Sequence, residues 1–155
     1  PRLQSAINAC GYDEDSYVAV HLRFVNALEN FEEVTCCDNA LHTEKEKTAL
    51  INRCKQGLLR IKEENGGCRV MVFSDSKRFL DSLVDISVEV LNHDNIGHVS
   101  HEGDDASTLK TFLDLYMIAR AKKVYRIDAP ELYAWSGFAL TGAMIGGKDF
   151  LTEKV

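Results

Sequence analysis

The sequence predicts an α/β domain with an open, mostly parallel, Rossmann-like sheet and helices on both faces. Short apolar runs rich in β-branched residues alternate with segments of helical periodicity, a pattern typical of parallel strands joined by crossover helices. The 155 residues are enough for one domain with a real core and short for two. We therefore expect a single domain over residues 1–155. Its ligand site should lie beyond the carboxyl ends of the strands, where the strand order reverses.

The first part of the chain predicts the end of a helix, a strand and a loop. Residues 5–10 are expected to end a helix that precedes the first strand. Residues 17–24 are rich in β-branched and aromatic side chains and are bounded by polar ones, which predicts a strand. Residues 26–42 are acidic and irregular, so we expect a loop there.

A long helix is predicted next. Thr43 and Glu46 fit a capping box, in which the threonine oxygen accepts from the amide three residues on and the glutamate reaches back. The helix is expected to stop at Asn65-Gly66-Gly67, because glycine readily ends helices. The apolar residues behind the cap recur at helical spacing and predict the buried face: Leu50, Cys54, Leu58 and Ile61.

The middle of the chain predicts two further strands around a short helix. Residues 68–73 form an apolar run interrupted by Arg69, as buried parallel strands do. Residues 88–91 predict a third, short strand, and residues 93–105 a polar loop. The short helix between the two strands is expected to place three side chains inward: Phe79, Leu80 and Leu83.

The last third predicts two helices and the remaining strands. Residues 123–127 predict a fourth strand, residues 136–145 a helix of small residues, and Phe150-Leu151 a segment that closes the sheet. An amphipathic helix before the fourth strand is indicated by a stripe of apolar residues, expected to belong to the core: Leu109, Phe112, Leu113, Tyr116 and Met117.

Polar residues mark the end of the first predicted strand. His21 and Arg23 alternate, so their side chains should lie on the same face of the strand. The planar fork of an arginine suits a diphosphate, to which it can make two parallel charge-assisted hydrogen bonds. The alternative is that His21 is a satisfied core histidine and Arg23 a surface residue at the strand end, and spacing alone does not separate the two interpretations.

Two more strand ends carry candidate ligand-binding residues. After the second strand, a carboxylate and two hydroxyls stand where free helix amides suit phosphate or ribose oxygens, although the same residue types are ordinary helix caps. Before the last helix, a glycine would let a ligand approach the backbone closely, although a plain helix start with a core phenylalanine fits equally well. The candidates are Ser74, Asp75, Ser76, Ser136, Gly137 and Phe138.

A resemblance to a known family is carried by four pieces in order: HLR (21–23), FSDS (73–76), TFLDLYMIARAKKVYRI (111–127) and SGFALTGAMIGG (136–147). Together they resemble the C-terminal donor-binding lobe of fucosyltransferases with two Rossmann-like lobes (GT-B type). The best fit is to bacterial relatives of the α-1,2, α-1,6 and protein O-fucosyltransferase group. The resemblance covers roughly residues 17–151. It implies an inverting transfer of fucose from GDP-fucose to a glycan or other hydroxyl acceptor, without a bound metal or other cofactor.

The resemblance also implies roles for single residues. Arg23 would hold the β-phosphate and stabilise charge on the leaving diphosphate, and His21 would line the same pocket. Asp114 matches an acidic position of its helix, where it would contact the donor or orient the helix from within. The remaining implied contacts are Ser74 and Asp75 to the nucleoside, and Ser136, Gly137 and Phe138 to the phosphates and the sugar.

The chain departs from the family in two ways. Many relatives carry a second basic residue and an acid soon after the motif arginine, whereas here Phe24 follows Arg23 and the next acid is Glu29. The general base is therefore unassigned. The acceptor-binding lobe of the relatives precedes the HLR strand, where this chain has only residues 1–16. We therefore expect either a fragment of a longer enzyme or a product that lacks acceptor recognition.

Two other functions remain as alternatives. One is a non-catalytic nucleotide-binding or regulatory domain of flavodoxin-like topology, and the other is an inactive remnant that binds a protein partner. Fucose and mannose both travel on GDP, so the sequence does not separate these two sugars.

Composition excludes some partners. The formal net charge of −6 argues against nucleic-acid binding, and no apolar run approaches the ~20 residues of a membrane helix. Scattered cysteines suggest a reducing compartment, which with the bacterial resemblance predicts the cytoplasm or its membrane surface. Cys36-Cys37 with His42 is weighed as a metal site and is disfavoured, because adjacent cysteines rarely both reach one ion with good geometry. For a second group, metal binding is weighed against plain solvation in a loop: His93, His98, His101, Asp104 and Asp105.

Overall fold

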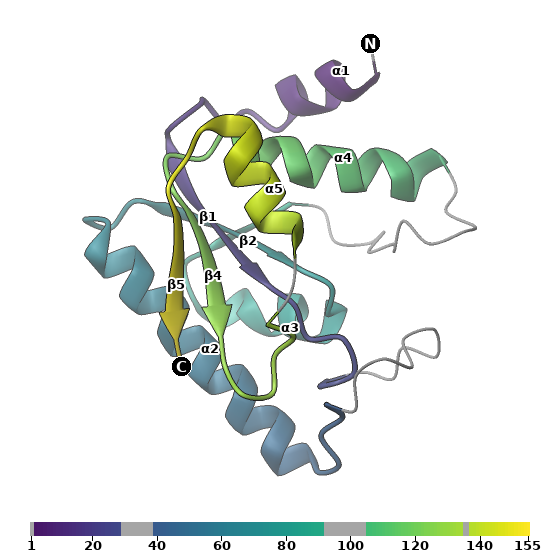
Figure 1. Cartoon of the computed structure of the whole chain (residues 1–155), viewed down its shortest axis with the longest axis vertical. Coiled ribbons are helices and arrows are strands. Elements are labelled where there is room, and N and C mark those ends of the chain that lie inside the picture. Colours follow the sequence, from purple (N-terminus) through teal and green to yellow (C-terminus); the bar gives the residue numbers. More distant parts are fainter. Residues whose placement is uncertain (1, 29–38, 92–104, 135–136) are drawn as a thin grey trace.

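Figure 1 shows the computed structural model of the chain, which describes residues 2–28, 39–91, 105–134 and 137–155. Strands and helices alternate along most of it, as predicted. In chain order the elements are α1 (Arg2–Ala9), β1 (Tyr17–Leu22), α2 (Glu44–Glu64), β2 (Arg69–Ser74), α3 (Lys77–Asp81), the 3₁₀ turn η1 (Ser82–Asp85), β3 (Glu89–Val90), α4 (Asp105–Ala119), β4 (Val124–Asp128), α5 (Gly137–Gly146) and β5 (Phe150–Lys154).

The strands form one parallel sheet. Their order is β3-β2-β1-β4-β5, and every neighbouring pair runs parallel. β2 and β3 lie on one side of β1, and β4 and β5 lie on its other side. The direction in which the chain adds strands to the sheet therefore reverses between the two central strands, β1 and β4. This is the Rossmann order rather than the 2-1-3-4-5 order of flavodoxin-like sheets. The predicted Rossmann-like α/β class is therefore confirmed, and the alternative of flavodoxin-like topology is wrong.

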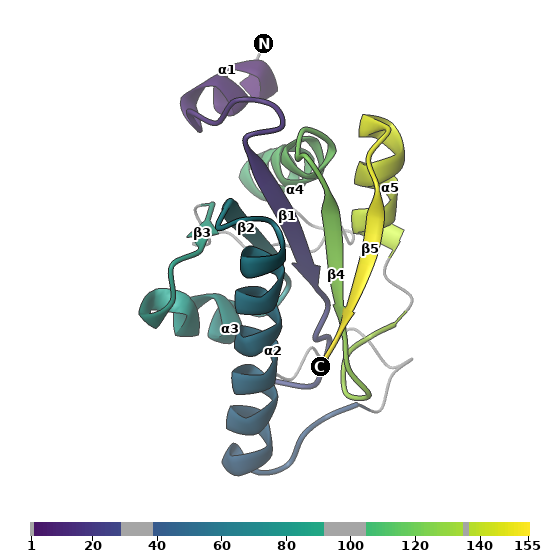
Figure 2. The same ribbon diagram turned by 90° about the vertical axis from the view of Figure 1, so that its left-hand side faces the viewer.

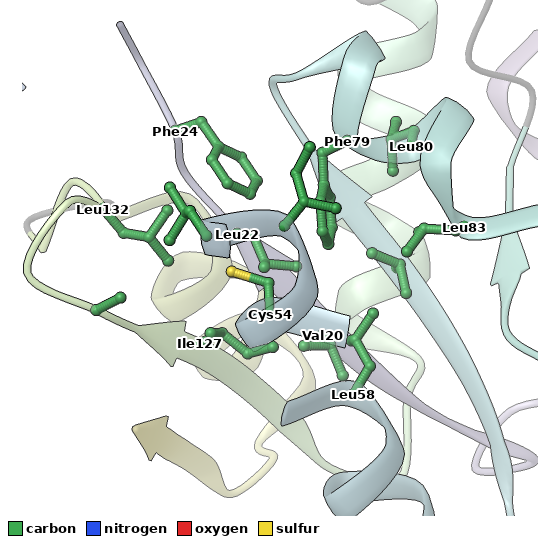
Figure 3. Close-up of a cluster of buried hydrophobic side chains, with 14 of the residues drawn as sticks. Val20, Leu22, Phe24, Cys54, Leu58, Phe79, Leu80, Leu83, Ile127 and Leu132 are labelled. Carbon is green, nitrogen blue, oxygen red and sulfur yellow. The ribbon is translucent and has the colours of Figure 1, made fainter. Parts of the chain in front are cut away.

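Helices cover both faces of the sheet. Alternate residues of β1 point to opposite faces, so that Val18, Val20 and Leu22 belong to one buried cluster and Tyr17 and Ala19 to the other. The first cluster packs beneath α2 and α3, as Figure 3 shows for ten labelled side chains. The second packs beneath α1, α4 and α5, and Figures 1 and 2 show the sheet between these two layers.

The helix α2 forms as its sequence predicts. The hydroxyl of Thr43 accepts from the Glu46 amide at 3.2 Å, and the Glu46 carboxylate accepts from the Thr43 amide at 2.9 Å, so the capping box is confirmed. Asn65 caps the carboxyl end. The four residues of the predicted stripe are fully buried: Leu50, Cys54, Leu58 and Ile61.

Strand β1 is shorter than predicted. It ends at Leu22, two residues before the predicted end, because the next backbone amides bond to a side chain instead of a neighbouring strand. The amides of Phe24 and Val25 donate to the carboxylate of Asp75, and Val25 takes a positive φ of 51°. Phe24 itself is buried, with its ring centroid 4.8 Å from that of Phe79.

The predicted apolar stripe of α4 is only partly core. Met117 is fully buried, but the side chains of Phe112 and Tyr116 are about half exposed. The helix turns these two toward solvent because α1, α5 and the sheet cover only part of its circumference. Among the described residues, no helix is long and apolar enough to cross a membrane.

Both candidate metal groups fall largely outside the described residues. Cys36-Cys37 lie in the undescribed range 29–38, and the histidines and Asp104 of the second group in 92–104. Asp105 is described: it begins α4, and its carboxylate lies 3.4 Å from the Arg2 guanidinium.

Candidate functional site

A recess opens where the strand order reverses. It is open to solvent and is formed by the carboxyl ends of β1 and β4, the segment after β4 and the first turn of α5. This is the place at which open α/β sheets bind ligands. The lining residues are His21, Arg23, Arg126, Ile127, Asp128, Tyr133, Ala134 and Ala139.

His21 is the penultimate residue of β1 and is buried. Its ring centroid lies 5.7 Å from that of Phe138 in α5, with the rings tilted by 38°. Burial and, to a smaller extent, the neighbouring charge of Arg23 together lower the pKa of His21 to about 4. The imidazole is therefore neutral at pH 7. His21 is thus a buried residue that also lines the recess, and its contact with a ligand stays a prediction.

Arg23 follows β1 directly and also lines the recess. Its Nε lies 3.4 Å from Oδ2 of Asp75, and about a quarter of its side chain stays exposed. Its backbone carbonyl accepts a hydrogen bond from the amide of Tyr133 at 2.9 Å. Arg23 is therefore held by the residue that follows β2 and by the segment after β4, with about a quarter of its side chain exposed.

Asp75 connects the carboxyl ends of β1 and β2. Oδ1 accepts from the Phe24 amide at 2.8 Å and Oδ2 from the Val25 amide at 2.9 Å, while the carboxylate also pairs with Arg23. Of the three polar residues weighed as caps of the following helix, Asp75 does not fill this role. The cap of α3 is Ser76, whose hydroxyl accepts from the Phe79 amide at 3.1 Å.

The other hydroxyl of this segment also bonds locally. Ser74 Oγ accepts from the Ser76 amide at 3.1 Å, and Ser76 is fully buried. None of the residues 74–76 lines the recess. The predicted contact of Ser74 and Asp75 with a nucleoside stays a prediction, and Asp75 forms an ion pair with Arg23.

The start of α5 faces the recess. Ala139, in its first turn, lines the recess, and Phe138 packs beside His21. A Cβ added at Gly137 would meet no described atom within 4 Å, so packing among the described residues does not require a glycine there. Ser136 lies outside the described residues.

The structure places Asp114 elsewhere. It lies on α4 and pairs with Lys110, one turn earlier, at 2.5 Å. Burial raises the pKa of Asp114. The carboxylate also contributes to raising the pKa of Cys10, after burial of that thiol. Asp114 thus lies toward the segment that follows α1, and it does not line the recess.

Two charged residues that line the recess were not predicted from the sequence. Arg126 and Asp128 alternate on β4, and both line the recess with His21 and Arg23. Arg126 lies directly beside His21 in the register of β1 and β4. A signal was present, because YRID repeats on the fourth strand the alternating polar pattern of VHLR on the first.

The fold and the position of the recess define a class of protein: a Rossmann-like α/β domain with a candidate ligand site at its topological switch point. Among solved structures, the chain is similar to NodZ α-1,6-fucosyltransferase co-crystallised with GDP, with a TM-score of 0.56 and 14% identity. It is also similar to Se-Met fucosyltransferase NodZ from Bradyrhizobium, with a TM-score of 0.55 and 14% identity. At this identity the similarity establishes the fold.

The alignments cover most of this chain but less than half of the NodZ chains. Each alignment covers 93% of this chain and 41% of the NodZ chain, so the chain spans about two fifths of the length of these neighbours. No protein-family model matches the sequence. No curated protein matches it either.

Proposed function

We propose that the chain is the donor-binding domain of a glycosyltransferase and binds a GDP-sugar, with GDP-fucose favoured, in the recess between β1 and β4. The observation that carries the proposal is the position of Arg23: a partly exposed side chain, paired with Asp75, that lines a recess at the switch point of a Rossmann-like sheet. The fold shared with the fucosyltransferase NodZ, one structure of which was obtained with GDP, supports this choice of ligand.

The recess offers complementary groups for a nucleoside diphosphate. Arg23 supplies a cation that can bond two phosphate oxygens at once. The first turn of α5 adds backbone amides and the positive end of a helix dipole, which favour an anion. His21, neutral at pH 7, can hydrogen-bond without adding charge. We expect the diphosphate to lie between Arg23 and the start of α5.

In the proposed transfer, the reaction develops negative charge on the diphosphate that leaves the sugar. A fixed cation beside that charge stabilises the transition state more than the ground state, which is the role we assign to Arg23. The acceptor hydroxyl attacks from the opposite face of the sugar, so the transfer inverts its configuration. Metal-independent action and the glycan nature of the acceptor belong to the same proposal.

The test is calorimetric titration of the chain with GDP, GDP-fucose, GDP-mannose and UDP, without added metal. We expect GDP and GDP-fucose to bind and UDP to bind at least about tenfold more weakly. Arg23→Ala should lower GDP affinity about tenfold or more, because a bidentate charged contact is lost. The fold should survive, since the carboxylate of Asp75 keeps its two amide donors.

Arg60→Ala is the matched control. Arg60 lies on α2, pairs with Glu153 and does not line the recess, so its loss should leave GDP affinity unchanged. Equal GDP binding by wild type and Arg23→Ala would remove Arg23 from the phosphate site. Binding of UDP as tight as that of GDP would contradict the proposed choice of donor.

A further inference from the structure

We propose that Arg126 is a second cation of the recess and binds the diphosphate together with Arg23. The inference rests on the proposed function for the identity of the nucleotide, but the phosphate contact itself follows from the placement and partners of Arg126. Arg126 lies on β4, beside His21 of β1, and lines the recess that Arg23 borders. The two arginines therefore reach one recess from the two strands between which the sheet order reverses.

The hydrogen bonds of Arg126 leave its charge available. Its Nε donates to Oγ1 of Thr152 on β5 at 3.0 Å, and one terminal nitrogen donates to the carbonyl of Ala134 at 2.7 Å. Both acceptors are neutral. Within the described ranges, no carboxylate lies within ion-pair distance of Arg126. A guanidinium carries five N–H donors, so these two bonds fix its plane while the others stay available for an anion.

Arg23 and Arg126 differ in this respect. Arg23 already has a buried counter-charge in Asp75, which reduces the electrostatic attraction of this site for an incoming anion. Arg126 lacks a paired carboxylate in the described part of the chain and is only partly buried. A diphosphate carries more than one negative charge, and two cations that line one recess from neighbouring strands match it better than one.

Asp128 gives the recess its third charge. It follows Arg126 by two residues on the same face of β4 and lines the recess as well. A carboxylate repels phosphate but accepts hydrogen bonds from hydroxyl groups. The recess thus combines two cations suited to a diphosphate with one carboxylate suited to the hydroxyls of a sugar or ribose.

The test uses two probes, GDP and inorganic pyrophosphate, titrated into the 155-residue chain without metal. Arg126→Gln removes the charge and is expected to weaken binding of both probes about tenfold or more. It should also make binding less dependent on salt, because one screened attraction is lost. Arg126→Lys keeps the charge without the planar fork and should weaken binding severalfold. If circular dichroism shows that Arg126→Gln does not fold, the affinity of Arg126→Lys decides whether Arg126 contacts phosphate.

Thr152→Val is the structural control. It removes the acceptor of the Nε bond but leaves the cation and its second bond, to the Ala134 carbonyl, so affinity should stay within about twofold of the wild type. If Thr152→Val weakens binding as much as Arg126→Gln, or if neither Arg126 variant changes the affinity, the proposal is overturned.

The two probes separate this inference from the proposed function. Binding of pyrophosphate without preference for GDP would reject the GDP-sugar proposal, while the Arg126 variants would still decide the phosphate contact. Binding of GDP that is equally tight in wild type and both Arg126 variants would reject the role of Arg126 alone. Failure of the wild type to bind either probe would reject both.

Discussion

At the scale of single residues, the recess combines a neutral histidine with a charged arginine at its side. Burial and the nearby Arg23 both disfavour protonation of His21 and lower its pKa to about 4, from an ordinary value of 6.5. The two residues can therefore occupy one strand end without mutual repulsion, because only one of them is charged at pH 7. A protonated His21 beside Arg23 would carry an uncompensated buried charge.

The lowered pKa of His21 predicts how stability depends on pH. The unfolded chain binds a proton at His21 below about pH 6.5, and the folded chain only below about pH 4. Stability from this residue is complete above pH 6.5 and falls as the pH drops toward 4, by about 3 kcal/mol in all. Urea unfolding between pH 7 and 4 should show a shallower decline for His21→Phe than for the wild type. Parallel declines would contradict the assignment.

The role of Asp75 predicts a larger loss than a helix cap would give. Asp75→Ala leaves two amides without their acceptor and removes the partner of Arg23, which should cost about 3 kcal/mol or more. Ser76→Ala removes the cap of α3 and should cost about 1 kcal/mol. Urea unfolding of the two variants compares them directly. A smaller loss for Asp75→Ala than for Ser76→Ala would show that the carboxylate is not the tie between β1 and β2.

At the scale of elements, α5 is positioned by its close approach to α4. A Cβ at Gly142 would lie 2.5 Å from Cγ2 of Ile118, and one at Gly146 only 1.9 Å from the carbonyl oxygen of Ala119. Small residues on α5 thus let the two helices pack nearly backbone to backbone. Because the first turn of α5 borders the recess, this packing also sets the position of the recess wall.

The contact between α4 and α5 predicts opposite effects for two glycines of one helix. Gly146→Ala forces the backbones apart and should destabilise the chain by about 3 kcal/mol. Gly137→Ala meets open space among the described residues and should leave stability unchanged or raise it by up to about 1 kcal/mol. Thermal unfolding of both variants checks this difference. Equal effects of the two substitutions would mean that α5 does not pack against α4 as described.

At the scale of the whole molecule, the fold collects a few charges from distant parts of an acidic chain. The formal net charge is −6, yet two arginines about 100 residues apart in sequence border one recess. They meet because β1 and β4 are neighbours in the sheet although two other strands separate them along the chain. The reversal of strand order creates the recess and also brings its two arginines together.

The sequence by itself determined the elements, because each depends on local chemistry. Alternating apolar runs, the capping box at Thr43 and the helical stripe that starts at Leu50 predicted nearly every strand and helix to within a few residues. His21 and Arg23 were found for the same reason, since alternation on one strand fixes a shared face.

Only the tertiary structure decided the site. Three features depend on which strands and helices become neighbours. Arg126 lines the same recess as Arg23, Asp75 binds the end of β1 instead of capping α3, and Asp114 lies away from the recess. Strand order is set by packing of the whole sheet and its two helical layers. No local pattern encodes it, because the contacts that select it join residues far apart in the chain.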